Sequence, residues 1–392
     1  MILLFASLAH AQGAPSSDFR FGGQFRLNLF AEQSADGNVQ VLGERIRLRP
    51  TTWMEIDDRV KGMLQLEANQ VDNAFAFRAR YADAAVRFGK AWVHVGLLPL
   101  SDRFGDTLFS ASWDFNPLAV SVESDEGDWH GRIAGGLVFQ GADPTSPDDD
   151  VALLLADLDR GIAGVSVVSL VGATNAAVST DQLLVVPGAR IAPTFGDFTL
   201  SASVLGSALV GDDANADTAL RSLGVAGRVE GKLAIGASEL AALVVYATGG
   251  GIPAGSMGHA FVTPMSQLGF HGYWGYTGRL TVQGPTDQGI DDPYNIDGGT
   301  YDRSNLGRGM ATGQVRATVP VSETVVLTGA TGAFLPAEGG LYGLDVLGQL
   351  TWKPVPQVSL DSIGTVTHFG ADHHARANTS AFLFATRLQM EF

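Results

Sequence analysis

The stretch FLFATRLQMEF, residues 382–392, decides the fold of this chain. Side chains of an extended strand alternate between its two faces, so every second residue points the same way. One face of this stretch is almost wholly apolar and consists of Phe382, Phe384, Thr386, Leu388, Met390 and Phe392. The other face is mixed and includes Arg387, Gln389 and Glu391. The pattern predicts a strand with one face against an apolar environment.

The composition extends this pattern to the whole chain. Of its 392 residues, 45% are hydrophobic and only 17% are charged, against about 25% charged in ordinary soluble proteins. The chain has no run of about 18 apolar residues, so the sequence predicts no membrane-spanning helix. High hydrophobicity without long apolar runs indicates alternating strands, and an aromatic ending is typical of the last strand of a bacterial outer-membrane barrel. We therefore expect an all-β chain forming a single transmembrane, antiparallel, up-and-down β-barrel.

The pattern of apolar alternation gives about eighteen strands, with sixteen as the alternative. An even number lets both chain ends lie on one side of the membrane. The predicted strands are 18–31, 42–56, 59–70, 77–88, 91–99, 114–124, 128–140, 150–157, 162–172, 182–194, 197–209, 218–231, 237–249, 305–320, 322–335, 341–353, 356–370 and 379–392.

The connections between these strands alternate in length. The short ones are predicted at 57–58, 89–90, 124–127, 158–161, 195–196 and 353–356. The long ones include SDRFGDTLFSASW, GADPTSPDDD, GATNAAVSTD and VGDDANADT. Outer-membrane barrels have short periplasmic turns and long extracellular loops. This sorting by length is the strongest support for the barrel.

Two segments stand apart from the strand pattern. Residues 1–11 are apolar and end in Ala9-His10-Ala11, so we interpret them as the remnant of a secretory signal peptide. The barrel domain then covers 12–392. Residues 250–304 take the place of one external loop and are far longer than the others, so we expect a loop insertion that either folds into the lumen or lies outside it.

Aromatic spacing agrees with the height of a membrane. Tyr342 and Trp352 are predicted on one outward face, ten positions apart, and Phe382 and Phe392 repeat that spacing. Ten residues at ~3.3 Å each and a tilt of ~40° span roughly 25 Å, the height of the lipid-facing band between aromatic girdles.

The predicted inward face is rich in arginine. The expected pore-lining residues are Arg20, Arg26, Arg45, Arg47, Arg49, Lys61, Arg87, Arg132, Arg190, Arg228, Arg308 and Arg316, with Arg387 on the last strand. Inward acids are fewer, namely Glu55, Glu67, Asp83, Glu123, Glu230, Asp361 and Glu391. Fixed guanidinium groups favour anions in a pore. The alternative is that the arginines pair with these acids as a structural lattice.

The phase of two further arginines, Arg78 and Arg80, is ambiguous. The alternation slips near Tyr81-Ala82, which is the pattern of a β-bulge.

Other kinds of chemistry find little support in the sequence. Neither G-x-S-x-G nor H-E-x-x-H occurs, and the chain has no cysteine, so we predict no enzyme, no cofactor and no metal site. Asp372-His373-His374 is interpreted as an exposed loop rather than as metal ligands. A net charge of −16 argues against nucleic acid as a partner.

Two segments resemble a known group of barrels. RIRLRP on the second strand and YADAAVRFGKAWVHVGLLPLSDRFGDTLFSASWDF across strands four to six are similar to the alginate-export and selective-porin group. Members of that group carry a Gly-Arg-Gln-like corner before a Gly-Asp loop. Gly96 and Gly105-Asp106 fit this pattern, whereas Leu97 and Leu98 replace the polar pair of the corner. The resemblance implies an eighteen-stranded barrel whose arginine-rich lumen conducts a polyanion.

Three functions follow as hypotheses. The first is passive passage of small or extended anionic solutes through the outer membrane. The alternatives are a non-selective general diffusion porin and a barrel-anchored surface adhesin or assembly protein. The expected partners are outer-membrane lipid, the anionic solute and, through the C-terminal strand, the barrel-assembly machinery. The sequence leaves the oligomeric state open.

Overall fold

The computed structural model describes most of the chain between Ser17 and Phe392. The described residues are 17–33, 39–71, 74–104, 108, 109, 111, 115–139, 151–172, 182–213, 218–250, 256–262, 309–337, 339–371 and 377–392. The predicted signal peptide at 1–11 lies outside them, as does most of the insertion at 250–304.

The described chain is built from β-strands, and none of its segments is a helix long and apolar enough to cross a membrane. The strands are β1 (Ser17–Gln33), β2 (Val39–Ile56), β3 (Val60–Val71), β4 (Ala74–Phe88), β5 (Ala91–Leu97), β6 (Leu118–Glu126), β7 (Trp129–Phe139), β8 (Val151–Arg160), β9 (Ala163–Gly172), β10 (Gln182–Ile191), β11 (Thr194–Phe195), β12 (Phe198–Asp213), β13 (Thr218–Ile235), β14 (Ser238–Ala247), β15 (Met257–Gly258), β16 (Met310–Pro320), β17 (Val325–Leu335), β18 (Gly343–Val355), β19 (Val358–Phe369) and β20 (Ser380–Glu391).

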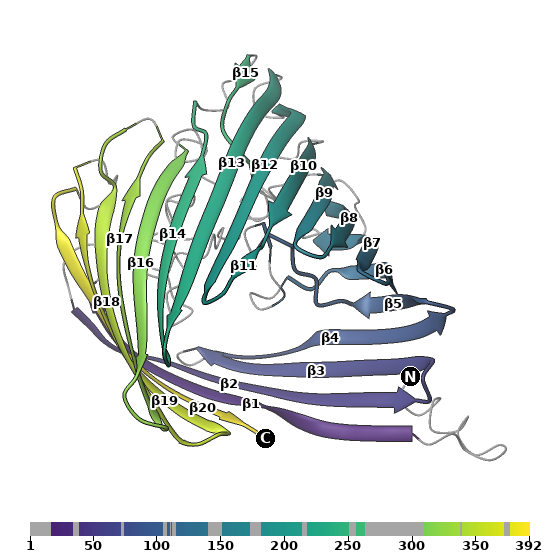
Figure 1. Cartoon of the computed structure of the whole chain (residues 1–392), viewed down its shortest axis with the longest axis horizontal. Coiled ribbons are helices and arrows are strands. Elements are labelled where there is room, and N and C mark those ends of the chain that lie inside the picture. The colour runs from purple at the N-terminus through teal and green to yellow at the C-terminus, as the bar shows by residue number, and fades with distance from the viewer. Residues whose placement is uncertain are drawn as a thin grey trace.

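These strands form one closed barrel. Each wall strand pairs antiparallel with the next, and β1 pairs with β20, which lies beside it in Figure 1. The two-residue β11 leads into β12, and β15 pairs in parallel with the loop-side end of β13. The wall therefore has eighteen strands, which confirms the predicted fold and strand number.

Short turns gather at one end of the barrel and long connections at the other, as predicted. Among the described turns, Gly89, Gly127, Gly161, Gly196 and Gly236 each begin a two-residue turn with φ between 53° and 61°. Glycine adopts positive φ without a Cβ clash, and hairpins with a glycine first in the turn match the twist of the strands. We call this the turn end and the opposite one the loop end.

Three predicted turns lie mostly within strands. The segment 158–161 is not the turn after β8, because the strand continues to Arg160 and turns at Gly161-Ile162. In the same way, 124–127 and 353–356 are largely strand, because β6 (which begins at Leu118 rather than 114) extends to Glu126 and β18 extends to Val355.

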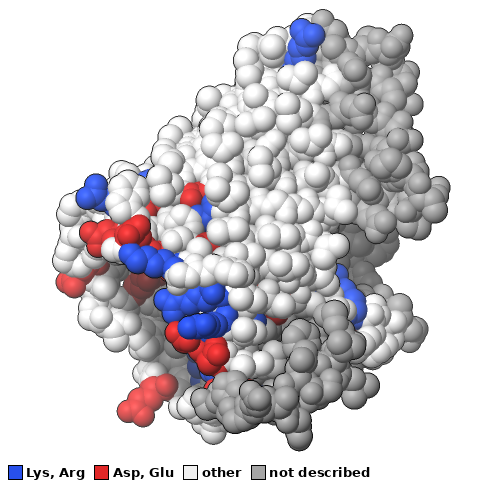
Figure 2. All heavy atoms as spheres, turned by 90° about the vertical axis from the view of Figure 1, so that its right-hand side faces the viewer, with Lys and Arg blue, Asp and Glu red and all other residues white. Residues whose placement is uncertain are grey.

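The outer wall is apolar. Alternate residues of β8, β9 and β14 are buried and exposed, and the exposed ones are mostly Leu, Val and Ala. Figure 2 shows an almost uncharged described surface on which most charged residues gather in one zone. Exposed aromatic residues ring the turn end, namely Phe19, Phe21, Phe88, Trp129, Phe195, Trp352 and Phe392. This is the pattern of a lipid-facing band with an aromatic girdle.

The last strand has the predicted faces, but one predicted girdle residue was wrong. Phe382 and Phe392 are exposed on the outer wall, while Leu383 and Ala385 are buried. Tyr342 is only 1% exposed, and its ring centroid lies 5.9 Å from that of Phe334, an inward residue. It precedes β18 rather than belonging to it, so strand alternation does not set its direction.

The ambiguous phase near Arg80 is a β-bulge. Gln65 pairs with Tyr81 while the next residue of β3, Leu66, pairs with Ala79, so Arg80 is the additional residue. Arg80 and Tyr81 are both buried at the bulge, although adjacent side chains of a regular strand point to opposite faces.

The loop end of the lumen is filled with apolar side chains. Leu98, Phe104, Leu108 and Phe109 of the β5–β6 connection pack in one cluster with inward residues of β8, β9, β10, β12 and β14. The described start of the long insertion, residues 256–262, contributes Phe261 and Val262 to the same cluster. These inward residues are apolar because the two connections cover them.

Candidate functional site in the lumen

An arginine cluster lies on the inner face of β2, β3 and β4. Arg49 Nε donates to Glu67 Oε2 at 2.6 Å, and Arg78 Nη2 donates to Glu67 Oε1 at 2.8 Å. Glu67 is 1% exposed and so holds both guanidinium groups from a buried position. Arg47 and Arg80 are also buried on this face. We call Arg47, Arg49, Arg78, Arg80 and Glu67 the β2–β4 cluster.

Arginines outnumber carboxylates among the described residues of this cluster. Its described residues contain four arginines and one carboxylate. The nearest other inward acid on β4, Asp83, lies on the turn side of the bulge and contacts His94 Nδ1 at 2.9 Å.

The β5–β6 connection is attached to this cluster. Arg80 Nη2 donates to the Ala111 carbonyl at 2.7 Å, and the Tyr81 hydroxyl donates to the same carbonyl at 2.6 Å. Arg80 Nη1 also donates to Gln65 Oε1 at 2.7 Å. The arginine-rich wall therefore faces a connection that runs inside the barrel.

Asp102 organises the described part of that connection. Its buried carboxylate accepts backbone N–H groups from Phe104 at 2.7 Å, from Leu108, and from Phe109 at 3.0 Å. Ser101 Oγ accepts the N–H of Ala111 at 2.9 Å. Polar backbone that lies inside a barrel needs such partners, because an unmade buried hydrogen bond is costly.

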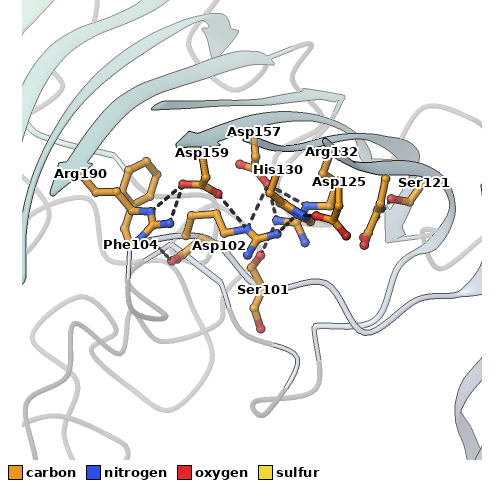
Figure 3. A network of polar contacts seen from close by, with 12 residues as sticks. Ser101, Asp102, Phe104, Ser121, Asp125, His130, Arg132, Asp157, Asp159 and Arg190 are labelled. Carbon is orange, nitrogen blue, oxygen red and sulfur yellow. Dashed lines mark hydrogen bonds and ion pairs between the residues drawn. The ribbon is translucent and has the colours of Figure 1, made fainter. Parts of the chain in front are cut away.

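The connection also meets a second charged cluster, on β7, β8 and β10 (Figure 3). Arg132 Nε donates to Asp157 Oδ2 at 2.7 Å, and Arg190 Nη2 lies 2.5 Å from Asp159 Oδ1. Arg103, from the connection itself, lies 3.9 Å from Asp157 Oδ2 and 3.6 Å from Asp159 Oδ2. We call Arg103, Arg132, Arg190, Asp157 and Asp159 the β7–β10 cluster.

The β7–β10 cluster is close to charge balance and lies under the connection. Arg132 Nη2 also donates to the Ser101 carbonyl at 2.8 Å. His130 contacts Arg103, and its Nδ1 lies 2.5 Å from Asp125 Oδ1. Three arginines and two aspartates thus fasten the connection to the wall.

The remaining predicted arginines of the long strands are also paired with polar groups. Arg228 Nη2 donates to Glu230 Oε2 at 2.8 Å, and Arg316 lies 3.9 Å from Glu230. Arg387 Nε donates to Asp361 Oδ2 at 2.9 Å, and Arg26 Nε donates to Gln389 at 3.2 Å.

Three predicted residues lie toward the turn end. Arg20 contacts Asp18 at 3.2 Å, Arg87 contacts Asp58 at 3.8 Å, and Lys61 lies over Trp92. Arg308 lies outside the described residues, and the side chain of Arg45 does too, although its backbone belongs to β2.

Sequence reasoning missed Asp157, Asp159 and Arg103. Asp157 and Asp159 are missed because the predicted strand ends at residue 157 and a turn is predicted at 158–161, whereas β8 continues to Arg160. The run VALLLADLDR is apolar on both faces toward the loop end, which hides its phase. The signal that finds them is the alternation Leu153, Leu155, Asp157, Asp159 on one face.

Among the described residues, no group of three histidine or carboxylate side chains is arranged to hold a metal ion. The segment 372–374 lies outside them.

Solved structures with the same fold are outer-membrane porins. OccK11 (OpdR) of Pseudomonas aeruginosa aligns with a TM-score of 0.60 at 10% identity, over 96% of both chains. OccAB1 of Acinetobacter baumannii gives 0.60 at 11% identity, over 98% of both. An anion-selective porin from Comamonas acidovorans gives 0.51 at 12% identity, over 96% of this chain and 100% of its own. No family model and no curated protein matches the sequence.

Likeness at this level of identity shows the fold. A closed barrel with an apolar outer wall and an aromatic girdle is the transmembrane barrel of the bacterial outer membrane, and this chain is one.

Proposed function

We propose that the chain is an outer-membrane channel through which small or extended anionic solutes pass by diffusion. The observation that carries this proposal is the β2–β4 cluster, in which four arginines lie with one carboxylate, two of them in contact with it, beside the connection inside the barrel. Charges this close have overlapping fields at physiological salt, where the Debye length is about 8 Å. The wall therefore attracts anions along the path that the connection narrows.

The fold supports a channel, since the similar structures are porins and one is described as anion-selective. The resemblance of RIRLRP and the following strands to alginate-export barrels adds an extended polyanion as one possible solute. The remaining arginine pairs fit the lattice interpretation, because each described one has a carboxylate or amide partner.

The test is the reversal potential of the purified channel in a planar bilayer under a KCl gradient. The double variant Arg47→Gln and Arg49→Gln removes two charges while Arg78 still holds Glu67. We expect the reversal potential to move from anion toward cation preference at low salt. The shift should shrink in molar salt, where the Debye length falls to about 3 Å.

Arg160→Gln is the matched control, because Arg160 lies on the outer face at the turn end, 5.1 Å over the Trp129 ring. It should leave the potential unchanged. A wild-type channel that prefers cations at low salt contradicts the proposal. A channel without preference indicates a general diffusion porin, and no conductance indicates a barrel that anchors surface loops.

A further inference from the structure

His130 joins the β5–β6 connection to the wall of the barrel. It lies on the inward face of β7, between Asp125 of β6 and Asp159 of β8, which pair with it on either side (Figure 3). Its Nε2 contacts Arg103 Nη2 of the connection, and its Nδ1 lies 2.5 Å from Asp125 Oδ1. One imidazole ring thus bridges a wall strand and the connection.

These two contacts assign the position of the proton on the ring. A guanidinium group can only donate hydrogen bonds, so Nε2 of His130 accepts from Arg103 and carries no proton. The neutral ring then holds its proton on Nδ1 and donates it to Asp125. The contact with the connection therefore requires a neutral histidine.

A second proton on His130 is incompatible with this contact. It places an N–H of the ring against an N–H of Arg103, and two donors cannot form a hydrogen bond. The two positive charges also repel each other at this range. Histidine side chains ordinarily change charge between about pH 5 and 8. A moderately acidic medium is therefore expected to break a contact that holds at neutral pH.

The surrounding charges decide which group moves when His130 is protonated. In the described part of the chain, the charged groups around it are Glu123 and Asp125 of β6, Asp128 of the turn before β7, Arg132 of β7, Asp157 and Asp159 of β8, Arg190 of β10 and Arg103 of the connection. All of them except Arg103 belong to the wall strands and their turns. The connection therefore carries the one cation that can leave without breaking the barrel.

Arg103 also has the longest contacts with the carboxylates. Its Nε lies 3.6 Å from Asp159 Oδ2 and 3.9 Å from Asp157 Oδ2, beyond hydrogen-bond distance. The two wall arginines donate to the same carboxyl groups at 2.7 Å and 3.0 Å. Asp159 Oδ2 accepts no hydrogen bond from a described residue, and its strand neighbours His130. A protonated His130 therefore has an acceptor beside it and displaces Arg103 from this carboxylate.

We infer that His130 and Arg103 form an acid-sensitive latch on the β5–β6 connection. At neutral pH the latch holds the connection against β7. Acidification protonates His130 and releases Arg103 toward the lumen, while Arg132 still holds the Ser101 carbonyl. The released segment narrows the path through the barrel. The latch thus regulates the proposed channel, although the contact itself does not depend on which solute passes.

The first test is hydrogen exchange of the connection, followed by mass spectrometry at about pH 5.5 and about pH 8, on either side of the ordinary titration of histidine. The amides of Phe104, Leu108 and Phe109 report on the connection, since they donate to Asp102. His130→Gln keeps an acceptor for Arg103 but does not titrate. At the lower pH we expect these amides to exchange about twofold to tenfold faster in the wild type than in His130→Gln, the range that the loss of one hydrogen bond corresponds to.

At the higher pH the wild type and His130→Gln should exchange equally. His130→Lys carries a positive charge under both conditions and should exchange fast in both. His368→Gln is the matched control, because His368 is an exposed histidine on the outer wall whose Nδ1 lies 3.1 Å from Ser380 Oγ. It should follow the wild type throughout.

Two results of the exchange experiment overturn the latch. One is equal exchange of the wild type and His130→Gln at the lower pH. The other is a response of the wild type centred near pH 4, where carboxyl groups ordinarily titrate, because it assigns the change to the aspartates of the cluster.

Single-channel current separates the latch from the channel proposal. Acidification should lower the mean current of the wild type and raise its noise, and His130→Gln should remove this response. The same pH response in both proteins contradicts the regulation by His130. A protein that conducts no current refutes the channel proposal alone, since hydrogen exchange still decides whether the latch exists.

Discussion

The β2–β4 cluster and the β7–β10 cluster both consist mainly of arginine, but they differ in the number of carboxylates beside the arginines. In the first, four arginines lie with one carboxylate, which Arg49 and Arg78 both contact. In the second, three arginines share two aspartates beneath the connection. The difference teaches that the number of neighbouring carboxylates, rather than the number of arginines, distinguishes the two clusters, since both of them hold the β5–β6 connection.

The largest expected effect comes from a substitution of Asp157 in the β7–β10 cluster. Its side chain is fully buried against Arg132, so Asp157→Asn leaves a buried guanidinium without its counter-charge. Removing one partner of a buried pair typically costs about 3–5 kcal/mol. We expect a loss of this size in the free energy of unfolding, measured by denaturant titration in detergent.

The double variant Asp157→Asn and Arg132→Met should recover part of that loss, since no unpaired charge remains. Equal stability of the double variant and Asp157→Asn would show that the two charges are not coupled.

Asp102→Asn should have a smaller effect. An amide presents one oxygen to the N–H groups of Phe104 and Phe109, where the carboxylate presents two. A buried donor without its partner costs about 1–3 kcal/mol. Because the change loosens the connection rather than the barrel, we expect noisier single-channel current, and a quiet current of wild-type size would contradict this role.

Glu67→Gln should act on selectivity in the opposite direction to the arginine variants. It removes the only carboxylate of the β2–β4 cluster, so anions become more favoured relative to cations. In bulk water a unit charge is worth about 1 kcal/mol to an ion about 4 Å away, which corresponds to a permeability ratio about fivefold higher. The reversal potential under a KCl gradient measures it, and a shift toward cations would refute the map of charges.

The smallest effect is expected for Glu126→Gln. Glu126 contacts Lys90 at 2.7 Å, but both side chains are exposed at the turn end. Exposed ion pairs contribute little to stability because water screens them. Neither the unfolding midpoint nor the reversal potential should change, and a clear shift in either would mean that the turn end contributes to the channel.

Much of the fold was predictable because strand alternation and turn chemistry are local. Eighteen strands, the sorting of connections by length and the slip near Tyr81 follow from period-2 patterns and glycine-rich turns. Tyr342 shows the limit of this reasoning. Its direction depends on packing against Phe334 across a connection, and alternation does not extend beyond a strand's end.

The site was predictable only in part. The inward phase of Arg47, Arg49 and Arg132 follows from alternation, but their partners do not. Arg103 reaches Asp157 and Asp159 because the β5–β6 connection turns into the barrel. No local pattern records that path, although the two-sided apolar character of β8 hints that something covers its inner face.

The seam between β1 and β20 has a consequence for the rate of folding. It joins Gln24 to Glu391 and Gly23 to Phe392, pairs separated by almost the whole described chain. Contacts this distant in sequence are slow to form, because the chain loses conformational entropy on closing the loop before the new contacts stabilise it. Until the seam closes, two strand edges offer unpaired backbone to other chains. Folding of this barrel therefore depends on bringing its two ends together before a neighbouring molecule pairs with either.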